Sequence, residues 1–210
     1  LQLGIPTRRP RVYVLARRVA DGGRGRLHDL EEAFPGSAAA ASSSLAAAVQ
    51  RTLADYLEPS LRATDMASLP ECLRVSEAML DRQFQFDRRW EVVGPDSTSS
   101  STFTSGYTAD CRDVHRFGPL LSLSGATVGQ RSPRDKLLPG GRELRLVLPT
   151  EAVRFFAPGE LLRIAGFPEG FAFPEDVTTK ARYKLIGDSI NVDVVAHLIH
   201  YLLFEWTSIG

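Results

Sequence analysis

The most constraining feature of this sequence is a helical periodicity close to its end. Between residues 192 and 206, apolar side chains recur at offsets of 0, 3, 4, 7, 10, 11 and 14, the spacing of one face of an α-helix. Gly187, Asp188 and Ser189 interrupt the chain just before this segment, and either Ser189 or Asn191 can cap its first turn. The sequence therefore predicts an amphipathic helix of about four turns that docks one face against another layer. That face consists of Val192, Val195, Ala196, Ile199, Leu202, Leu203 and Trp206.

Composition limits the class of protein. The chain has 210 residues, 43% of them hydrophobic, which suffices for one ordinary domain or two small ones and excludes wholesale disorder. Arginines fill the N-terminal region where a signal peptide would be apolar, and His197, His200 and Glu205 interrupt the longest apolar stretch, so we expect neither a signal peptide nor a membrane span. Two cysteines are too few for a disulfide scaffold, which favours a reducing compartment, cytoplasmic or nuclear. Because the first methionine is Met66, we interpret the chain as a fragment.

Charge is balanced overall but uneven along the chain. The 25 Lys and Arg residues match 25 Asp and Glu residues, which excludes a uniformly basic nucleic-acid binder. Residues 1–28 nevertheless carry seven arginines against one acid, Asp21. This pattern indicates either a basic face beside a phosphate-bearing partner or an ordinary solvated surface, with equal weight.

The rest of the chain predicts short elements joined by loops. Residues 11–17 and 90–93 are apolar and β-branched runs, which predict strands. An Ala/Ser-rich stretch at residues 37–48 predicts a loop that enters a helix, and a second short helix is expected at residues 70–80. The apolar stripe of the first of these helices is Leu45, Val49, Leu53 and Leu57.

Four segments resemble conserved motifs of the cytosine-5 methyltransferases, in the family's order. Residues 3–16 resemble the eighth motif, residues 154–168 the ninth, and residues 182–192 (Arg-Tyr-Lys-Leu-Ile-Gly-Asp-Ser-Ile-Asn-Val) the last. Residues 102–107 (Thr-Phe-Thr-Ser-Gly-Tyr) resemble the Cys-Phe-Thr signature of the tRNA-methylating branch, the type-2 DNA methyltransferase homologues. Four ordered segments are far more specific than any single one.

The resemblance implies an α/β fold, namely the C-terminal part of a Rossmann-like S-adenosylmethionine-dependent methyltransferase with an inserted target-recognition region. Residues 1–18 would end the first catalytic portion with the eighth-motif strand, residues 19–150 would form the recognition region, and residues 151–210 would return to the catalytic domain. The family's Pro-Pro-Cys nucleophile precedes the eighth motif and is absent here, as are its glycine-rich cofactor loop and base-binding glutamate. Cys72 follows Leu69-Pro70-Glu71 but lies after the eighth motif, so we expect this chain alone not to methylate anything.

The resemblance also assigns site residues. Arg9 and Arg11 match the two arginines that help to hold the flipped cytosine and the nearby backbone, a task that suits a planar guanidinium; pairing with a carboxylate at a strand end is the alternative. We expect the signature segment to place the RNA, or else to be a well-packed strand; its residues are Thr102, Phe103, Thr104, Gly106 and Tyr107. The last motif would lie near the methionine end of S-adenosyl-L-methionine, through Gly187, Asp188, Ser189, Ile190, Asn191 and Val192.

Three motif positions depart from the family. Thr102 replaces a cysteine, and Ala157 replaces a threonine that would cap a helix, a loss that typically costs about 0.5–2 kcal/mol. Asp188 replaces an asparagine, and we hypothesise that its carboxylate weakens cofactor binding unless it points away and caps a helix. We expect no metal site, because His197 with His200 and Cys111 with His115 lack a third ligand.

These expectations together favour an S-adenosylmethionine-dependent cytosine-5 methyltransferase that acts on tRNA, represented here by its C-terminal part. A DNA cytosine-5 methyltransferase is the alternative within the same chemistry, which the segment at residues 102–107 argues against. A catalytically inactive fragment that binds RNA or a partner protein is the alternative from another class. The expected partners are tRNA (or DNA) and the N-terminal catalytic half, with no membrane.

Overall fold

A small mixed sheet contributes to the hydrophobic core of the structure. The computed structural model describes residues 5–16, 51–62, 68–76, 79, 91–108, 118–123 and 153–205. Within them, strand β1 (Val92–Val93) is parallel to β2 (Leu120–Ser122), which is antiparallel to β3 (Val153–Arg154). Every residue of these strands is buried.

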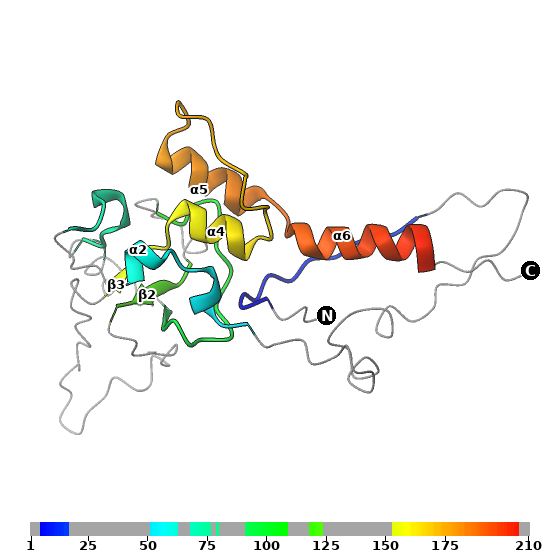
Figure 1. Cartoon of the computed structure of the whole chain (residues 1–210), viewed down its shortest axis with the longest axis horizontal. Coiled ribbons are helices and arrows are strands. Elements are labelled where there is room, and N and C mark those ends of the chain that lie inside the picture. Colours follow the sequence, from blue (N-terminus) through cyan, green and yellow to red (C-terminus); the bar gives the residue numbers. More distant parts are fainter. Residues whose placement is uncertain are drawn as a thin grey trace, which may run out of the picture.

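Helices follow β3 in a continuous series (Figure 1). They are α4 (Pro158–Ile164), α5 (Thr179–Asp188) and α6 (Val192–His200), with a π-helical turn, η8 (Tyr201–Glu205), at the end. Helix α4 packs against α5, whereas α6 extends away from the sheet (Figure 1). The shorter elements are the 3₁₀ turns η3 (Leu53–Tyr56) and η5 (Glu71–Leu73) and the helical turn α2 (Pro59–Arg62).

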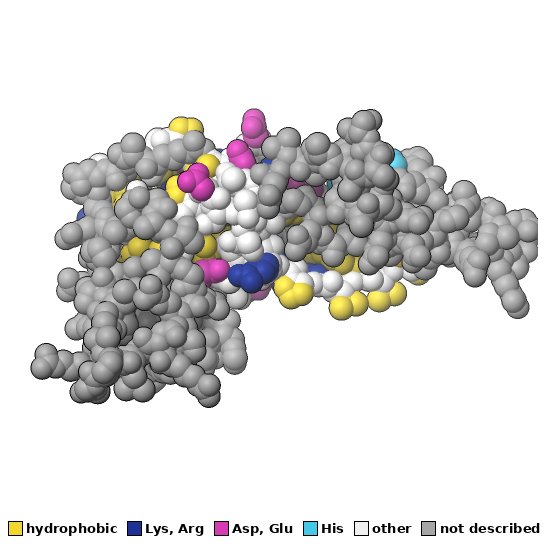
Figure 2. All heavy atoms as spheres, turned by 90° about the horizontal axis from the view of Figure 1, so that it is seen from below, with side chains coloured by type: hydrophobic (Ala, Val, Ile, Leu, Met, Phe, Trp, Pro, Cys, Tyr) yellow, Lys and Arg dark blue, Asp and Glu magenta, His cyan; other side chains and the backbone are white. Residues whose placement is uncertain are grey.

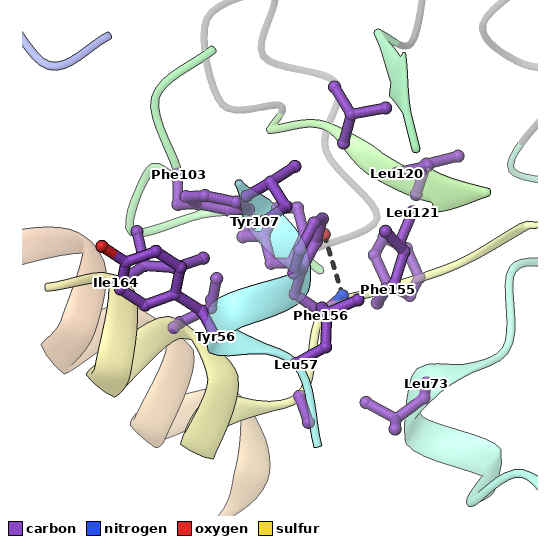
Figure 3. Packing of buried hydrophobic residues seen from close by; sticks show 14 of the residues in the cluster. Tyr56, Leu57, Leu73, Phe103, Tyr107, Leu120, Leu121, Phe155, Phe156 and Ile164 are labelled. Carbon is purple, nitrogen blue, oxygen red and sulfur yellow. Dashed lines mark hydrogen bonds between the residues drawn. The ribbon is translucent and has the colours of Figure 1, made fainter. Parts of the chain in front are cut away.

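Aromatic rings at residues 103–107 pack against those at residues 155–156 in one core (Figure 3). The Phe103 ring packs edge to face against Tyr107 at a centroid distance of 5.3 Å and against Phe156 at 5.1 Å. Tyr107 also contacts Tyr183 of α5 at 5.5 Å. Such pairs add about 0.5–1.5 kcal/mol each beyond their burial. The core thus includes residues from both the expected recognition region and the expected return segment, and the three-part division of the chain stays a prediction.

A buried ion pair connects β3 to α4. The Arg154 guanidinium donates to both carboxylate oxygens of Glu160, at 2.8 and 2.7 Å, and both side chains are 0% exposed. The same carboxylate accepts the backbone N–H groups of Ala157 at 2.7 Å and of Glu58 at 3.0 Å. Four hydrogen bonds therefore compensate the buried charge of Glu160, as burial of a carboxylate requires.

Helix α4 begins without a side-chain cap. Ala157 occupies the N-cap position and has no oxygen that could accept a free amide of the first turn, while Pro158 follows at the first helical position. Glu160 supplies only the reciprocal half of a capping box, by accepting from the Ala157 amide.

Restoring that cap should stabilise the protein. We expect Ala157→Ser to raise the free energy of unfolding by about 0.5–1 kcal/mol, because its hydroxyl can accept the free amide of residue 160. Urea unfolding of the 210-residue chain measures the change. The matched control is Ala196→Ser in the interior of α6, which offers no free amide and should cost about 0.5 kcal/mol. Equal effects of the two substitutions would contradict the assignment of Ala157 as the N-cap.

The predicted terminal helix is confirmed. Asn191 caps it, since its Oδ1 atom accepts from the Val194 amide at 3.0 Å, whereas Ser189 belongs to the end of α5. Helical structure continues through η8, so that it covers most of the predicted length. The prediction at residues 90–93 is confirmed at β1.

Two other predicted elements differ from the structure. No strand is present at residues 11–16, so the strand prediction there is wrong; a strand needs a neighbour that completes its ladder, and no described segment lies in that place. Leu53 and Leu57 of the apolar stripe are buried, but Leu53 begins a single 3₁₀ turn and Leu57 follows its end, so they do not lie on a long helix. Leu45 and Val49 lie outside the described residues. In the described part of residues 70–80, the expected helix is represented by the 3₁₀ turn η5 and by the helical residue Met79.

Hydrophobic side chains remain exposed at residues 12–14 and along α6 and η8. Val12 and Val14 are 93% and 89% exposed, and Ile199 and Leu203 are 52% and 55% exposed. Figure 2 shows hydrophobic side chains projecting along one edge of the described surface. Because Ile199 and Leu203 belong to the apolar face predicted to dock, while Leu198 on another side is buried, the docking of that face stays a prediction.

Candidate functional site

Local capping interactions define both ends of α5 and the start of α6. The Thr178 hydroxyl accepts from the Ala181 amide at the start of α5, at 3.3 Å. At the end of α5, the amide and hydroxyl of Ser189 donate to the Ile186 carbonyl at 3.1 and 2.7 Å. Asn191 then starts α6. The last-motif segment at residues 187–192 therefore spans the end of one helix and the beginning of the next.

Both polar atoms of the Asn191 side-chain amide make structural hydrogen bonds. Its Oδ1 atom caps α6, and its Nδ2 group donates to the Ile164 carbonyl at the end of α4, at 3.0 Å. The adjacent Val192 amide donates to the Ala165 carbonyl at 2.8 Å. These bonds attach the junction to α4, so Asn191 positions the expected cofactor segment with a side chain that is already occupied.

Gly187 brings the junction against the signature segment. A Cβ atom at this position would lie 2.2 Å from the Ser105 nitrogen and 2.4 Å from the Thr104 carbonyl carbon. Such distances leave no room for any side chain, and the obstacle is backbone that cannot rotate away. The sequence therefore needs glycine here so that two segments about 80 residues apart can touch.

Arg9 brings the eighth-motif segment to the same junction. Its guanidinium donates to the Gly187 carbonyl at 2.7 Å and also to the Ser189 carbonyl. Burial lowers the pKa of Arg9 from its ordinary value, and the neighbouring charge of Arg11 lowers it further. With a pKa that starts far above neutrality, the guanidinium remains a cation.

Residues 5–9, which reach the α5–α6 junction through Arg9, are also hydrogen-bonded to residues 100–102. The Arg8 amide donates to the Ser100 carbonyl at 2.8 Å, and the Thr102 hydroxyl donates to the Arg8 carbonyl. The Ser100 hydroxyl donates to the Pro6 carbonyl at 2.9 Å. The eighth-motif, signature and last-motif segments, which the sequence singled out separately, thus meet at one place.

The two candidate arginines differ in their surroundings. Arg9 is partly buried, whereas Arg11 is exposed and, among the described residues, donates to the carbonyl of its neighbour Pro10 at 3.0 Å. Within the eighth-motif segment, the arginine that pairs with a carboxylate is Arg8, which lies 3.3 Å from Glu91. Sequence analysis missed Arg8 and Glu91, because no local pattern reveals an ion pair between residues so far apart in the chain. The contact of Arg9 or Arg11 with a cytosine stays a prediction.

The signature segment forms a tightly packed turn instead of a strand. Phe103, Gly106 and Tyr107 are buried, while Thr102 and Thr104 are partly exposed. The Tyr107 hydroxyl donates to the Pro119 carbonyl at 2.6 Å and accepts from the Phe156 amide at 3.1 Å (Figure 3). Burial raises the pKa of Tyr107 well above its ordinary value. The aromatic side chains therefore shape the turn from within, whereas Thr102, Thr104 and Ser105 are partly exposed.

Removing the Tyr107 hydroxyl should destabilise this turn. We expect Tyr107→Phe to lower the free energy of unfolding by about 1–3 kcal/mol, because it leaves the Phe156 amide and the Pro119 carbonyl buried without this partner. Thermal or urea unfolding of the chain measures the effect. Tyr13→Phe, at a residue that is 37% exposed, is the control and should change stability by less than about 0.5 kcal/mol. A neutral Tyr107→Phe would mean that other groups satisfy both backbone atoms.

Asp188 points toward solvent and pairs within its own helix. Its carboxylate accepts from the Lys184 ammonium at 2.6 Å, and this hydrogen bond lowers the pKa of Asp188. Asp188 is the last residue of α5, where a negative charge opposes the helix dipole, so it does not cap a helix start as the sequence hypothesis allowed. Lys184 offsets that charge. Ile190, which lies between the C-cap of α5 and the N-cap of α6, is 47% exposed.

A family model of the C-5 cytosine-specific DNA methylases matches residues 1–203. The chain belongs to this methylase family. The expected resemblance is thereby confirmed over nearly the whole sequence.

Relatives within the methylase family extend well beyond the matched region. The Homo sapiens tRNA (cytosine(38)-C(5))-methyltransferase is 52% identical over 152 residues, which cover 72% of this chain and 36% of the human protein. The Schizosaccharomyces pombe protein of the same name is 32% identical over 204 residues, which cover 96% of this chain and 52% of that protein. The crystal structure of S. pombe Dnmt2 methyltransferase superposes with a TM-score of 0.59 at 26% identity, covering 96% and 55% of the two chains. The chain therefore spans from about a third to about half of its relatives' length, and the expected α/β class is confirmed.

Members of the methylase family use S-adenosylmethionine as methyl donor, and the junction has features that fit it. Two polar atoms there, Arg9 Nε and Thr104 Oγ1, are buried with no hydrogen-bond partner among the described residues. Both residues lie beside Gly187. An acceptor such as the methionine carboxylate would satisfy the Arg9 Nε–H group, which otherwise remains costly.

Other reactive side chains contribute no further site in the described part of the chain. Cys72 is exposed, far from the family's nucleophile position in sequence order, and Cys111 lies outside the described residues. No group of three His, Cys, Asp or Glu side chains is arranged there to hold a metal ion. None of the described helices has the length and apolarity that crossing a membrane requires.

Proposed function

We propose that this chain is the C-terminal part of an S-adenosylmethionine-dependent tRNA cytosine-5 methyltransferase. The single observation that carries the proposal is the meeting of three motif segments at the α5–α6 junction. Arg9 bonds to the carbonyls of Gly187 and Ser189, Thr102 bonds to Arg8, and Gly187 abuts the Thr104–Ser105 backbone. A site that must hold a cofactor beside a base needs such convergence of distant segments.

The location of each site residue decides which ligand it would contact. S-adenosylmethionine supplies the methyl group, and residues 187–192, to whose backbone Arg9 is hydrogen-bonded, would hold its methionine end. Arg11, whose guanidinium is free of any carboxylate within the described structure, is available for a cytosine or a phosphate oxygen. Thr102, Thr104 and Ser105 are the partly exposed residues of the signature turn. The nucleophilic thiolate would come from a separate catalytic half. This chain alone would therefore bind its ligands but would methylate no substrate.

The same proposal includes the organisation and location of the protein. Residues 1–18 and 151–210 would belong to the catalytic domain and residues 19–150 to target recognition, in the cytoplasm, the nucleus or both. tRNA is favoured as substrate by the signature segment and by the names of the human and S. pombe relatives. DNA is the second candidate because the matched family is named for DNA methylation.

A chimera tests the function. This chain replaces the matched segment of the S. pombe relative, and methyl transfer from labelled S-adenosylmethionine is measured on tRNA with cytosine or uracil at position 38 and on duplex DNA. We expect transfer to the cytosine-bearing tRNA alone. Transfer to DNA would favour the second candidate, and tRNA binding without transfer would favour an inactive RNA-binding fragment. The 210-residue chain by itself is the control and should transfer no methyl group.

The same chimera tests the Asp188 hypothesis. Because the Asp188 carboxylate is exposed and bonded to Lys184, we now expect Asp188→Asn to change S-adenosylmethionine affinity by less than about threefold. Isothermal titration calorimetry measures it. An affinity gain of tenfold or more, on the order of 1.4 kcal/mol, would restore the original hypothesis that the carboxylate repels the cofactor.

A further inference from the structure

We propose that Arg9 is a positioning residue that fixes the cofactor side of the site, so that the two eighth-motif arginines have different tasks. The inference rests on the proposed function for its meaning in catalysis, but the contacts that carry it belong to this chain. In this division, Arg9 acts on the protein's own backbone and Arg11 remains for the substrate.

The acceptors of Arg9 lie where a helix leaves its carbonyls unpaired. The last four carbonyl groups of an α-helix have no partner within the helix, and Gly187 belongs to the final turn of α5. One guanidinium nitrogen of Arg9 donates both to the Gly187 carbonyl and to the Ser189 carbonyl just beyond. A cation at this end also complements the helix dipole. The arginine therefore completes the end of α5 and holds the turn into α6.

The backbone beside Arg9 is itself fixed by hydrogen bonds to residues 100–102. Both backbone polar groups of Arg8 are bonded to residues 100–102, and Pro10 follows immediately with a fixed φ angle. Arg9 thus extends from an anchored stretch of backbone, and its head group cannot leave the junction without losing both carbonyl contacts. It acts as a brace between the signature turn and residues 187–189.

The two arginines are separated by their exposure as well as by their partners. Arg9 is partly buried, and its Nε–H group is buried without a partner in the described structure, while Arg11 is exposed. A side chain with two backbone acceptors already in place is poorly suited to release them for a transient base. Loss of Arg9 should therefore disturb the cofactor before it disturbs the RNA.

Hydrogen–deuterium exchange of the 210-residue chain tests the brace without any activity. We expect Arg9→Ala to speed exchange of the Ser189, Val192 and Val194 amides by about tenfold or more while β2 and β3 keep their protection. Arg11→Ala is the matched control and should leave these rates unchanged. Unchanged junction amides in Arg9→Ala, or equal acceleration throughout the chain, would overturn the proposal. Should Arg9→Ala not fold, Arg9→Lys supplies the test, with an intermediate and still local acceleration.

Kinetics of the chimera give the second readout. Arg9→Ala should raise KM for S-adenosylmethionine by about tenfold and change KM for tRNA by less than about twofold, and Arg9→Lys should recover part of the loss. The opposite split, with KM for tRNA raised, would assign Arg9 to the substrate and overturn the proposal. If the unsubstituted chimera transfers no methyl group, the proposed function fails, whereas the exchange experiment still decides the role of Arg9.

Discussion

Replacement of Glu160 by alanine should lower the free energy of unfolding by about 3–5 kcal/mol, because it leaves a buried guanidinium charge without its partner. Arg154 and Glu160 are both fully buried, and two hydrogen bonds of 2.8 and 2.7 Å connect them. The substitution also removes the acceptor for the amides of Ala157 and Glu58. Urea unfolding of the chain, followed by circular dichroism, measures the loss.

Three further variants make this result specific. Glu169→Ala removes an exposed carboxylate from the loop after α4 and should cost less than about 0.5 kcal/mol. Glu160→Gln retains the shape but not the charge, and it provides a smaller loss if the alanine variant does not fold. Arg154→Met combined with Glu160→Leu should recover part of the stability, because no unpaired charge is then buried. An alanine variant as stable as the Glu169→Ala control would contradict the buried pair.

Gly187→Ala should lower the free energy of unfolding by about 3 kcal/mol, although helix propensity alone predicts the opposite sign. Alanine is favoured over glycine by about 1 kcal/mol in a helix interior, and Gly187 lies within α5. The added Cβ would, however, overlap the Ser105 nitrogen at 2.2 Å, and separating two backbones costs more than the propensity gain. Thermal and urea unfolding give the size and the sign of the effect.

Gly170 provides the matched control for this substitution. A Cβ atom at Gly170 would meet nothing within 4 Å, so Gly170→Ala should be neutral or stabilise by about 0.4–1 kcal/mol through the unfolded state. Similar stability of the two variants would show that residues 104–105 do not press against α5. A large loss at Gly187 alone would establish this contact as the reason for glycine in the last motif.

Local patterns were sufficient for the parts of the structure that depend on neighbours in sequence. The spacing at residues 192–206 predicted α6, and Asn191 was one of two predicted caps. The β-branched run at residues 90–93 predicted β1. These elements are determined by side-chain periodicity and by hydrogen bonds over three or four residues, which a sequence displays directly.

The remaining features depend on contacts between distant segments. The pairing of Arg154 with Glu160 was not predicted, since no sequence pattern between β3 and α4 indicates that both charges are buried. The role of Arg9 was assigned to the substrate by resemblance, while its bonds to Gly187 and Ser189 join residues 178 and 180 positions apart. The signature turn resembled a strand because packed aromatic residues are common to both. Motif recognition thus singled out segments that the fold brings together, but only the fold showed which of their side chains are buried or already hydrogen-bonded to the protein.

The pair of tyrosines around Phe156 determines where the chain tolerates changes in length. The Tyr107 hydroxyl accepts the Phe156 amide, and the Tyr183 hydroxyl donates to the carbonyl of the same residue at 2.7 Å. Phe156 lies between β3 and α4, so one peptide position is clamped between side chains from two distant segments. Insertion or deletion of a single residue there would shift the clamped position and misalign α4 with the sheet, whereas the loop at residues 168–172, away from these hydroxyls, can vary in length during divergence.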